Sequence, residues 1–515
     1  MEDMRTIREV FGFLGPDKKI KNLFYGNAIV LGLELAFLAF YANFLPPEVP
    51  LWYTKVWGEG QLTNPIFLGL LPFITFIIII STLIISKFFI KRNELEVAHF
   101  VSILGLILNA CLFLSLSRIL NISSLPTPNY FSSDMSRILS PLLVGALVTY
   151  FTAPMVIKLT HKFGVIDDPK THKHPAILHK VPIPRAGAVA FFIGFLASSL
   201  IFIQNPEYLT AHYLTGLYLG VGIIIVLGVI DDKLDLNPYL RLGILSLAIL
   251  LIIFSGVRAL YIDDPFNGVF RLDTIKFQFN LFGPKEIILL ADIFSFLWIL
   301  WVANLLSWSN GVDGQFSGII FITALVIAIL SVRPAAEGSQ AQIATLAAAT
   351  AGGALGLLPF TWHPAKIFWG FGAAAVGMII AVLSIFSGTK VATASLILMV
   401  PLLDALYAIF RRVRAGKSPF FGDRAHLHHK LLDLGWSHQK IALFYWLATL
   451  VLGISALGVS GKAKLMAIIT AGGTVGFLIA FVSLKGEGGK RRLLQLVGKA
   501  PKEISPENGK NAENR

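Results

Sequence analysis

The sequence predicts an all-α, polytopic integral membrane protein with about 14 transmembrane helices. Apolar residues make up 55% of the 515 residues and charged residues only 14%, and the mean hydropathy is +0.72. A soluble domain carries roughly a quarter charged residues. Apolar stretches of about 20 residues, enough to cross a bilayer core of roughly 30 Å, recur along the whole chain. Such runs favour helices over barrel strands, because lipid offers the backbone no hydrogen-bond partners.

The apolar stretches place the helices along the chain. The predicted spans are residues 23–44, 66–90, 98–120, 137–158, 186–204, 213–230, 239–257, 286–305, 315–332, 342–359, 367–387, 391–410, 440–459 and 464–484. An 11-helix core within residues 137–485 therefore follows three extra helices within residues 1–125, a module whose role the sequence does not indicate. The composition of residues 486–515 predicts a disordered, basic and polar cytoplasmic tail.

The basic residues of the connections fall on one side of the predicted membrane. An even number of spans puts both termini on this side. Its lysines and arginines are Lys18, Lys19, Lys21, Lys87, Lys91, Arg92, Lys158, Lys162, Lys170, Lys173, Lys180, Arg185, Arg411, Arg412, Arg414, Lys417, Arg424, Lys430, Lys490, Arg491 and Arg492. By the positive-inside rule this side is cytoplasmic, and we expect a plasma (inner) membrane protein. The net charge of +13 then reflects this bias and anionic membrane or phosphate partners, and not nucleic-acid binding.

An acidic cluster ends the sixth predicted span on this side. Asp231 and Asp232 are adjacent, and Asp235 follows them. Neighbouring carboxylates at a membrane interface repel each other unless a cation or a basic partner offsets their charge. Carboxylate oxygens suit Mg²⁺, which commonly bridges to a substrate phosphate. The alternative is a solvated loop that caps the helix beginning after Asn237.

A second acidic position lies within residues 304–315. Gly311 and Gly314 permit close backbone approach or positive φ, and Asp313 brings another carboxylate to the same side. The alternative is a tight interhelical turn, which Asn-Gly and Asp-Gly pairs favour.

Basic and imidazole side chains form the remaining clusters. In residues 166–185 prolines give a rigid path, and Lys, His and Arg donors suit phosphate oxygens, although an ordinary basic loop has the same composition. Residues 359–370 contain Trp362 and Trp369, which are typical of interfacial anchors. Residues 422–432 hold three histidines beside basic residues and predict a phosphate clamp; zinc is the weaker alternative, because no cysteine completes a tetrahedral site.

In this order and spacing, the clusters resemble the polyprenyl-phosphate N-acetylhexosamine-1-phosphate transferases of glycosyltransferase family 4. The resemblance covers roughly residues 137–485. Its motifs are residues 182–187, 228–232, 304–314, 363–368, 401–404 and 423–429. The His-Leu-His-His form of residues 426–429 looks more like the undecaprenyl-phosphate N-acetylglucosamine-1-phosphate transferases than the lipid I-forming phospho-MurNAc-pentapeptide transferase.

The resemblance implies a reaction. An N-acetylhexosamine-1-phosphate, GlcNAc-1-phosphate in the nearer relatives, passes from a UDP-sugar to polyprenyl (undecaprenyl) phosphate, and UMP is released. This is the first membrane step of cell-envelope polysaccharide synthesis. An anionic phosphate must attack an anionic pyrophosphate, so Mg²⁺ or Mn²⁺ and cationic side chains are expected to offset the repulsion. The implied partners are polyprenyl phosphate, a UDP-N-acetylhexosamine and the lipid bilayer; a homodimer is left open.

The resemblance also assigns roles to single residues. The aspartates that it implies to be catalytic are Asp231, Asp232 and Asp313. The expected metal ligands are these three together with Asp235, which belongs to the same acidic cluster. Residues implied to bind substrate are Lys173, Arg185, Asn304, Asn310, Arg424, His426, His428 and His429.

The sequence departs from the family pattern at three positions. Asn310 and Ser307 stand where the family has Asp and often Asn, and Phe371 replaces an aspartate that is a magnesium ligand in the family. Phenylalanine cannot ligate Mg²⁺. Two readings remain: a metal held by the four aspartates in a rearranged site, or a degenerate member that binds polyprenyl phosphate or nucleotide sugar without turnover. A transporter is a third, opposed by acidic residues that gather at one interface and not at the bilayer midplane.

Overall fold

The computed structural model confirms an all-α membrane protein. It describes residues 17–41, 45–51, 61–92, 94–123, 133–169, 181–203, 211–264, 268–280, 284–332, 340–386, 390–418, 426–458 and 461–485. The predicted tail at 486–515 lies outside these residues. The chain divides into two compact units between Ser140 and Pro141.

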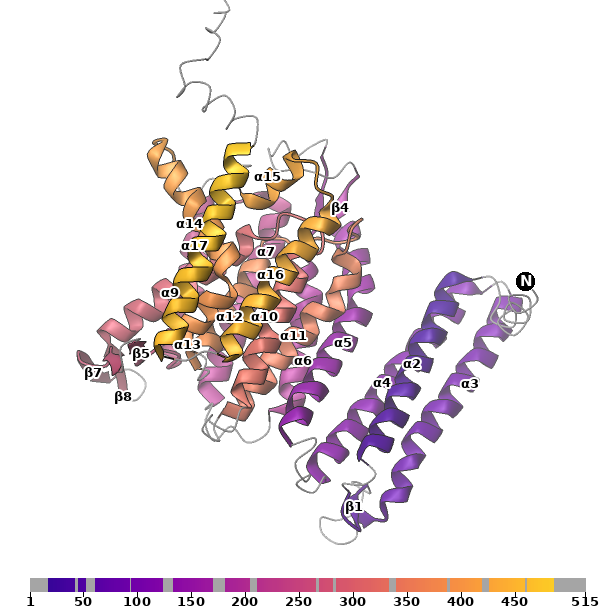
Figure 1. Ribbon diagram of the computed structural model, residues 1–515. Helices are drawn as coiled ribbons and strands as arrows, with labels where there is room; N and C mark the ends of the chain where they lie inside the picture. The colour runs from indigo at the N-terminus through magenta and orange to yellow at the C-terminus, as the bar shows by residue number, and fades with distance from the viewer. Residues whose placement is uncertain are drawn as a thin grey trace, which may run out of the picture. The chain divides into compact units, whose positions relative to one another are not determined.

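Unit 1 contains three long helices that pack on one another (Figure 1). They are α2 (Lys18–Tyr41), α3 (Leu70–Lys91) and α4 (Leu95–Ser123), accompanied by the 3-10 helix η3 (Pro65–Gly69) and the strands β1 (Val49–Pro50) and β2 (Leu62–Thr63). Buried polar side chains join the helices: Asn109 Nδ2 donates to Asn27 Oδ1 at 2.6 Å, and Thr75 Oγ1 to Glu34 Oε1 at 3.0 Å. Such bonds hold helices together in lipid, where hydrophobic burial between helices contributes little.

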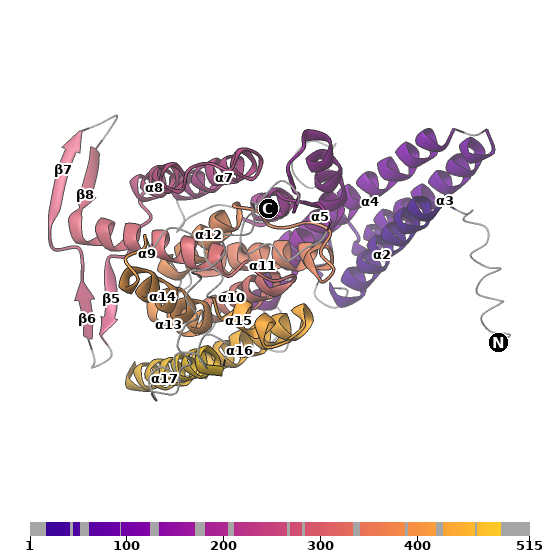
Figure 2. The same cartoon turned by 90° about the horizontal axis from the view of Figure 1, so that it is seen from above.

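Unit 2 contains the remaining helices. The helix α5 (Ser133–Phe163) leads into it, and the others are α6 (Gly187–Phe202), α7 (Ala211–Leu234), α8 (Pro238–Phe254), α9 (Leu289–Trp308), α10 (Gln315–Ser331), α11 (Ala341–Thr361), α12 (Ala373–Phe386), α13 (Lys390–Ile397), α14 (Met399–Arg414), α15 (Leu427–Asp433), α16 (His438–Gly458) and α17 (Gly461–Lys485). Figure 2 shows α10, α11 and α12 between α7 and α8 on one side and α16 and α17 on the other.

Small residues allow the central helices of unit 2 to approach closely. A Cβ added at Gly145 of α5 would lie 2.9 Å from the carbonyl oxygen of Ala349 in α11, and one at Gly356 would collide with the carbonyl oxygen of Ala146. Close backbone approach over small residues is the usual way in which membrane helices gain packing energy. The run of Ala and Gly in α11 is therefore a packing surface, and most of the helix is buried.

Short antiparallel hairpins connect some helices. Strand β3 (Ile166–Asp167) pairs with β4 (Ile183–Pro184). At the other end of unit 2, β5 (Tyr261–Asp264) pairs with β6 (Gly268–Arg271), and β7 (Lys276–Asn280) with β8 (Pro284–Ile288) (Figure 1). These two hairpins lie in the connection between α8 and α9, for which the sequence predicted no secondary structure, so they are an addition to the predicted fold.

Every predicted span overlaps a helix. Among the described residues, eight helices are long and apolar enough to cross a membrane, and α6, α8, α10 and α12 are apolar but shorter. The span predicted at 391–410 corresponds to two helices, α13 and α14, which are bent by 84° relative to each other. Pro401 lies in the first turn of α14, and its ring nitrogen cannot donate the hydrogen bond that would continue α13. The number of membrane crossings stays a prediction.

Candidate active site

The predicted polar clusters lie at the end of unit 2 that carries β4 and α15 (Figure 1). The connection from α11 to α12, residues 362–372, contacts three of them. Its His363 contacts Asp313, and the N–H of its Phe371 donates to Asp232 at 3.2 Å. Phe368 N–H donates to the carbonyl of Pro184 at 2.8 Å. One connection therefore touches the strand before Arg185, the acidic pair and Asp313.

Two arginines offset the acidic pair at the end of α7. Both aspartates are buried. Arg241 Nε lies 2.8 Å from Asp231 Oδ1, and Arg185 Nη1 lies 3.9 Å from Asp232 Oδ1. Arg185 Nη2 also donates to Asp167 Oδ2 at 2.6 Å. Arg241 was not among the predicted site residues, although it follows the acidic cluster closely in the sequence.

The predicted metal ligand Asp235 is exposed, unlike the buried acidic pair. Its side chain is 78% exposed, and its carboxylate accepts from Arg241 Nη2 at 3.0 Å. No three of the four predicted metal ligands form a cluster of metal-binding atoms within 4.8 Å among the described residues. Asp231, Asp232 and Asp235 thus lie at the end of α7, whereas Asp313 contacts histidines of other connections.

The chain approaches Asp232 closely at residues 370–371. Gly370 has φ of +67°, and a Cβ there would collide with the Asp232 carboxylate, so glycine is needed for this approach. Phe371 stands where the family has a carboxylate; its ring centroid lies 5.7 Å from the guanidinium carbon of Arg241. At this position the chain supplies a backbone N–H to Asp232 in place of a metal ligand.

Asp404 fixes the first histidine of residues 426–429. His426 Nδ1 lies 2.9 Å from Asp404 Oδ2, and the Leu427 N–H donates to Asp404 Oδ1 at 2.7 Å. Arg412 Nη2, which can only donate, lies 3.4 Å from His426 Nε2. Nε2 must therefore accept, and Nδ1 carries the proton. Asp404 belongs to a motif of the resemblance, but its role as the acceptor for His426 was missed, since sequence does not show which side chains meet.

The other two histidines are buried in the first turn of α15. His428 is 1% exposed and His429 is 3% exposed. The ring of His428 stacks parallel to that of His426 with centroids 5.5 Å apart, and it lies against Gly311, where a Cβ would collide with it. Burial lowers the pKa of His428 well below its usual range, and the neighbouring His429 and His426 lower it further. His428 is therefore neutral at neutral pH.

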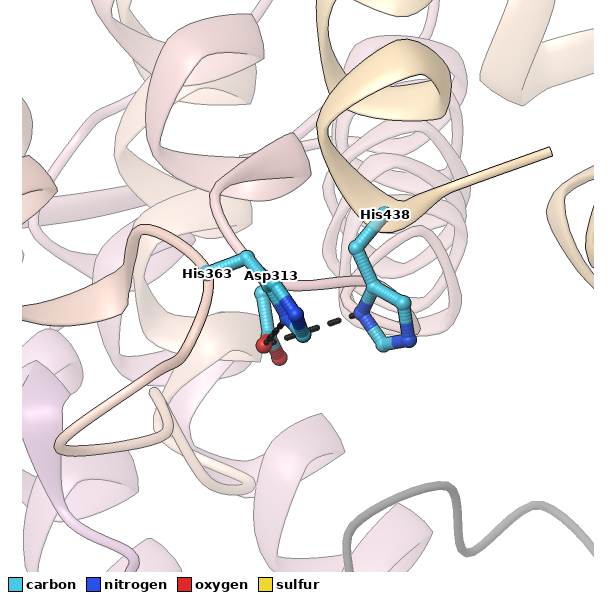
Figure 3. A group of neighbouring side chains, drawn as sticks. All are labelled: Asp313, His363 and His438. Atoms are coloured by element: carbon cyan, nitrogen blue, oxygen red, sulfur yellow. Dashed lines mark hydrogen bonds and ion pairs between the residues drawn. The ribbon is translucent and has the colours of Figure 1, made fainter.

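Asp313 faces two histidines from other connections (Figure 3). Its Oδ2 lies 2.7 Å from His363 Nδ1 and 3.6 Å from His438 Nδ1, and it accepts the Ala365 N–H at 3.2 Å. Sequence reasoning missed both histidines: His363 was grouped with interfacial tryptophans, and His438 begins α16, a different segment. Only the fold brings the three together.

Two of the remaining predicted residues make local hydrogen bonds, and two lie outside the described residues. Asn304 Nδ2 donates to the carbonyl of Leu300 in its own helix at 2.8 Å. The N–H of Asn310 donates to the Ser307 carbonyl at 3.3 Å in the turn after α9. Lys173 and Arg424 lie outside the described residues. Their predicted contact with substrate stays a prediction.

Fold and site together define a multi-pass membrane protein with buried carboxylates and imidazoles at one end of a helical unit. A sequence model of glycosyl transferase family 4 matches residues 214–388. A probable undecaprenyl-phosphate N-acetylglucosaminyl 1-phosphate transferase of Bacillus subtilis (strain 168) is 30% identical over 331 residues, 63% of this chain and 85% of that protein. The chain therefore belongs to glycosyl transferase family 4, which confirms the resemblance.

Two further relatives show the range of similarity. A decaprenyl-phosphate N-acetylglucosaminephosphotransferase of Mycolicibacterium smegmatis (strain ATCC 700084 / mc(2)155) is 30% identical over 344 residues, 61% of this chain and 80% of that protein. A phospho-N-acetylmuramoyl-pentapeptide-transferase of Desulfitobacterium hafniense (strain DSM 10664 / DCB-2) is 26% identical over 340 residues, 62% of this chain and 96% of that protein. The first two relatives are thus more similar to this chain than the third.

Proposed function

We propose that the chain transfers N-acetylglucosamine-1-phosphate from UDP-N-acetylglucosamine to a polyprenyl phosphate and releases UMP. Family membership and the names of the more similar relatives support the reaction class. The observation that carries the proposal to this chain is the convergence of its motifs: the acidic pair, Arg185 and the segment around Phe371 share contacts at one end of unit 2.

The reaction joins two anions. A phosphate oxygen of the lipid attacks the sugar-bearing phosphorus of the donor, a new P–O bond forms there, and the bond to the bridging oxygen breaks so that UMP leaves with that oxygen. In this proposal the acidic pair acts on the lipid phosphate and the histidines of residues 426–429 contact the donor diphosphate. Because such transfer depends on positioning and electrostatic stabilisation, fixed side chains supply most of the catalysis.

Magnesium at the family position does not fit the residues of this chain. Phe371 offers no ligand there, and arginines already lie against both carboxylates of the acidic pair. Repulsion between the reacting phosphates is offset in this proposal by Arg185, Arg241 and the histidines. The positive-inside bias supports a cytoplasmic position for the site and both termini, in the plasma (inner) membrane.

The direct test is turnover by the purified full-length protein. Undecaprenyl phosphate is incubated with UDP-N-acetylglucosamine, UDP-N-acetylgalactosamine or the UDP-muramoyl-pentapeptide, each with Mg²⁺ and with Mn²⁺, and UMP and lipid product are quantified. We expect UMP and lipid-linked sugar in equal amounts with UDP-N-acetylglucosamine. Saturable binding of the lipid phosphate without UMP release from any donor would contradict the proposal and favour a member that binds without turnover.

A change at Asp404 tests the orientation of His426. Asparagine has one acceptor oxygen, so Asp404→Asn leaves either the His426 Nδ1–H or the Leu427 N–H facing an amide group. An unpaired buried donor costs roughly 1–3 kcal/mol. We expect a lower melting temperature and turnover reduced about 10-fold or more. Asp433→Asn, at the exposed end of α15, is the control. Wild-type rate and stability in Asp404→Asn would show that the contact does not matter.

A further inference from the structure

Three metal-binding side chains converge outside the predicted carboxylate set. Asp313 lies in the connection from α9 to α10, His363 in that from α11 to α12, and His438 begins α16. Figure 3 shows both imidazoles turned toward the carboxylate. One ligand atom from each lies within 4.8 Å of the others, and among the described residues this is the one group of three or more His, Cys, Asp or Glu side chains that meets this condition.

One nitrogen of this group is left without a hydrogen bond. His438 Nδ1 is buried and has no hydrogen-bond partner among the described residues; Asp313 Oδ2 is 3.6 Å away. That oxygen already lies 2.7 Å from His363 Nδ1 and accepts the Ala365 N–H. A buried polar atom without a partner is unfavourable and calls for an explanation. A cation bound between the three side chains would coordinate this nitrogen and neutralise the carboxylate.

The spacing suits a tetrahedral metal. Metal–ligand bonds of about 2.0–2.1 Å place two ligands of a tetrahedral site roughly 3.3 Å apart. The distances from Asp313 Oδ2 to the two imidazoles, 2.7 and 3.6 Å, lie on either side of this value. Small side-chain rotations therefore complete three protein ligands. Two imidazoles and one carboxylate select a transition metal such as Zn²⁺, Mn²⁺ or Co²⁺, because Mg²⁺ prefers oxygen ligands.

We propose that Asp313, His363 and His438 form a divalent transition-metal site with one open position. Three protein ligands leave a fourth position for water or a substrate oxygen. The imidazoles are partly exposed to solvent: the His363 side chain is 36% exposed, and that of His438 is 20% exposed. Gly311, in the same turn as Asp313, contacts His428. If the open position takes an oxygen of a substrate phosphate, that role rests on the proposed function, whereas metal binding by the three side chains does not.

The test is metal binding to the untagged, chelator-treated full-length protein without substrates. Titration with Co²⁺, followed by its visible absorption, is expected to saturate at one equivalent, and Zn²⁺ is expected to displace the Co²⁺. His363→Ala and His438→Ala should each weaken Co²⁺ binding at least about 100-fold, since even the loss of an outer partner of a metal ligand costs 10–100-fold. His161→Ala, an exposed histidine at the end of α5, should bind as the wild type does.

A ligand exchange separates metal binding from structural damage. His363→Cys keeps a metal ligand, so it should retain Co²⁺ and add a thiolate-to-cobalt charge-transfer band that a purely structural role of His363 would not produce. No saturable Co²⁺ binding by the wild type, equal affinity in His363→Ala, or absence of the new band would each overturn the site. Turnover in a protein that binds no transition metal would overturn the site and leave the proposed function standing.

Discussion

Replacing Asp232 by asparagine is expected to lower turnover with UDP-N-acetylglucosamine at least about 100-fold, the scale of losing one well-placed electrostatic group. The substitution keeps the shape of the side chain and an oxygen that accepts the Phe371 N–H, so the close approach of residues 370–371 is preserved. What changes is the charge opposite Arg185. Initial rates of UMP release at saturating substrate measure the effect.

The control for Asp232→Asn removes a carboxylate at the other end of unit 2. Glu286 is exposed in strand β8, and Glu286→Gln should leave the rate unchanged. Melting temperatures of both variants establish that they are folded. A rate within about threefold of the wild type in Asp232→Asn would show that the acidic pair is structural only.

Removing the imidazole of His428 is expected to lower turnover by at least about 100-fold as well. Burial keeps this imidazole neutral, so its contribution is a fixed hydrogen-bonding group and not a positive charge. Its Nδ1 is buried and has no hydrogen-bond partner among the described residues. In the proposed function this nitrogen bonds to the donor diphosphate. His428→Ala is measured by UMP release, with His161→Ala as the control.

Gly311→Ala tests the position of the same imidazole without removing it. The added methyl group would collide with the His428 ring and must displace it, so the rate should fall although every histidine is retained. If Gly311→Ala and His428→Ala both turn over at the wild-type rate, the position of His428 has no part in catalysis.

The membrane helices were predictable because hydropathy is a local property. A long run of apolar residues predicts a membrane helix regardless of what that helix packs against. Every predicted span overlaps a helix in the structure. Residues 391–410 show the limit: hydropathy predicts a span there, but it does not predict the 84° bend between α13 and α14. The hairpin of β5 and β6 did have a local signal in the sequence, since Pro265 and the Asn-Gly pair at 267–268 are residue types that favour turns.

The site was only partly predictable, since its contacts join distant segments. The motifs predicted which carboxylates and histidines form the site, and the predicted topology put them on one side of the membrane. They could not show that Asp404 orients His426, that Arg241 pairs with Asp231, or that His363 and His438 face Asp313. Each of these pairs comes from residues whose side chains meet only in the folded chain. The four-carboxylate metal set failed to converge for the same reason.

The proposed function requires the acidic pair and the histidines of residues 426–429 to act as one site. A double-mutant cycle of Asp232→Asn and His428→Ala, measured as UMP release from UDP-N-acetylglucosamine, tests this directly. Residues that act as a unit have effects far from additive. We expect the double variant to be little slower than the slower single variant. A loss equal to the product of the two single losses, about 10,000-fold if each is about 100-fold, would show two independent sites and contradict the account.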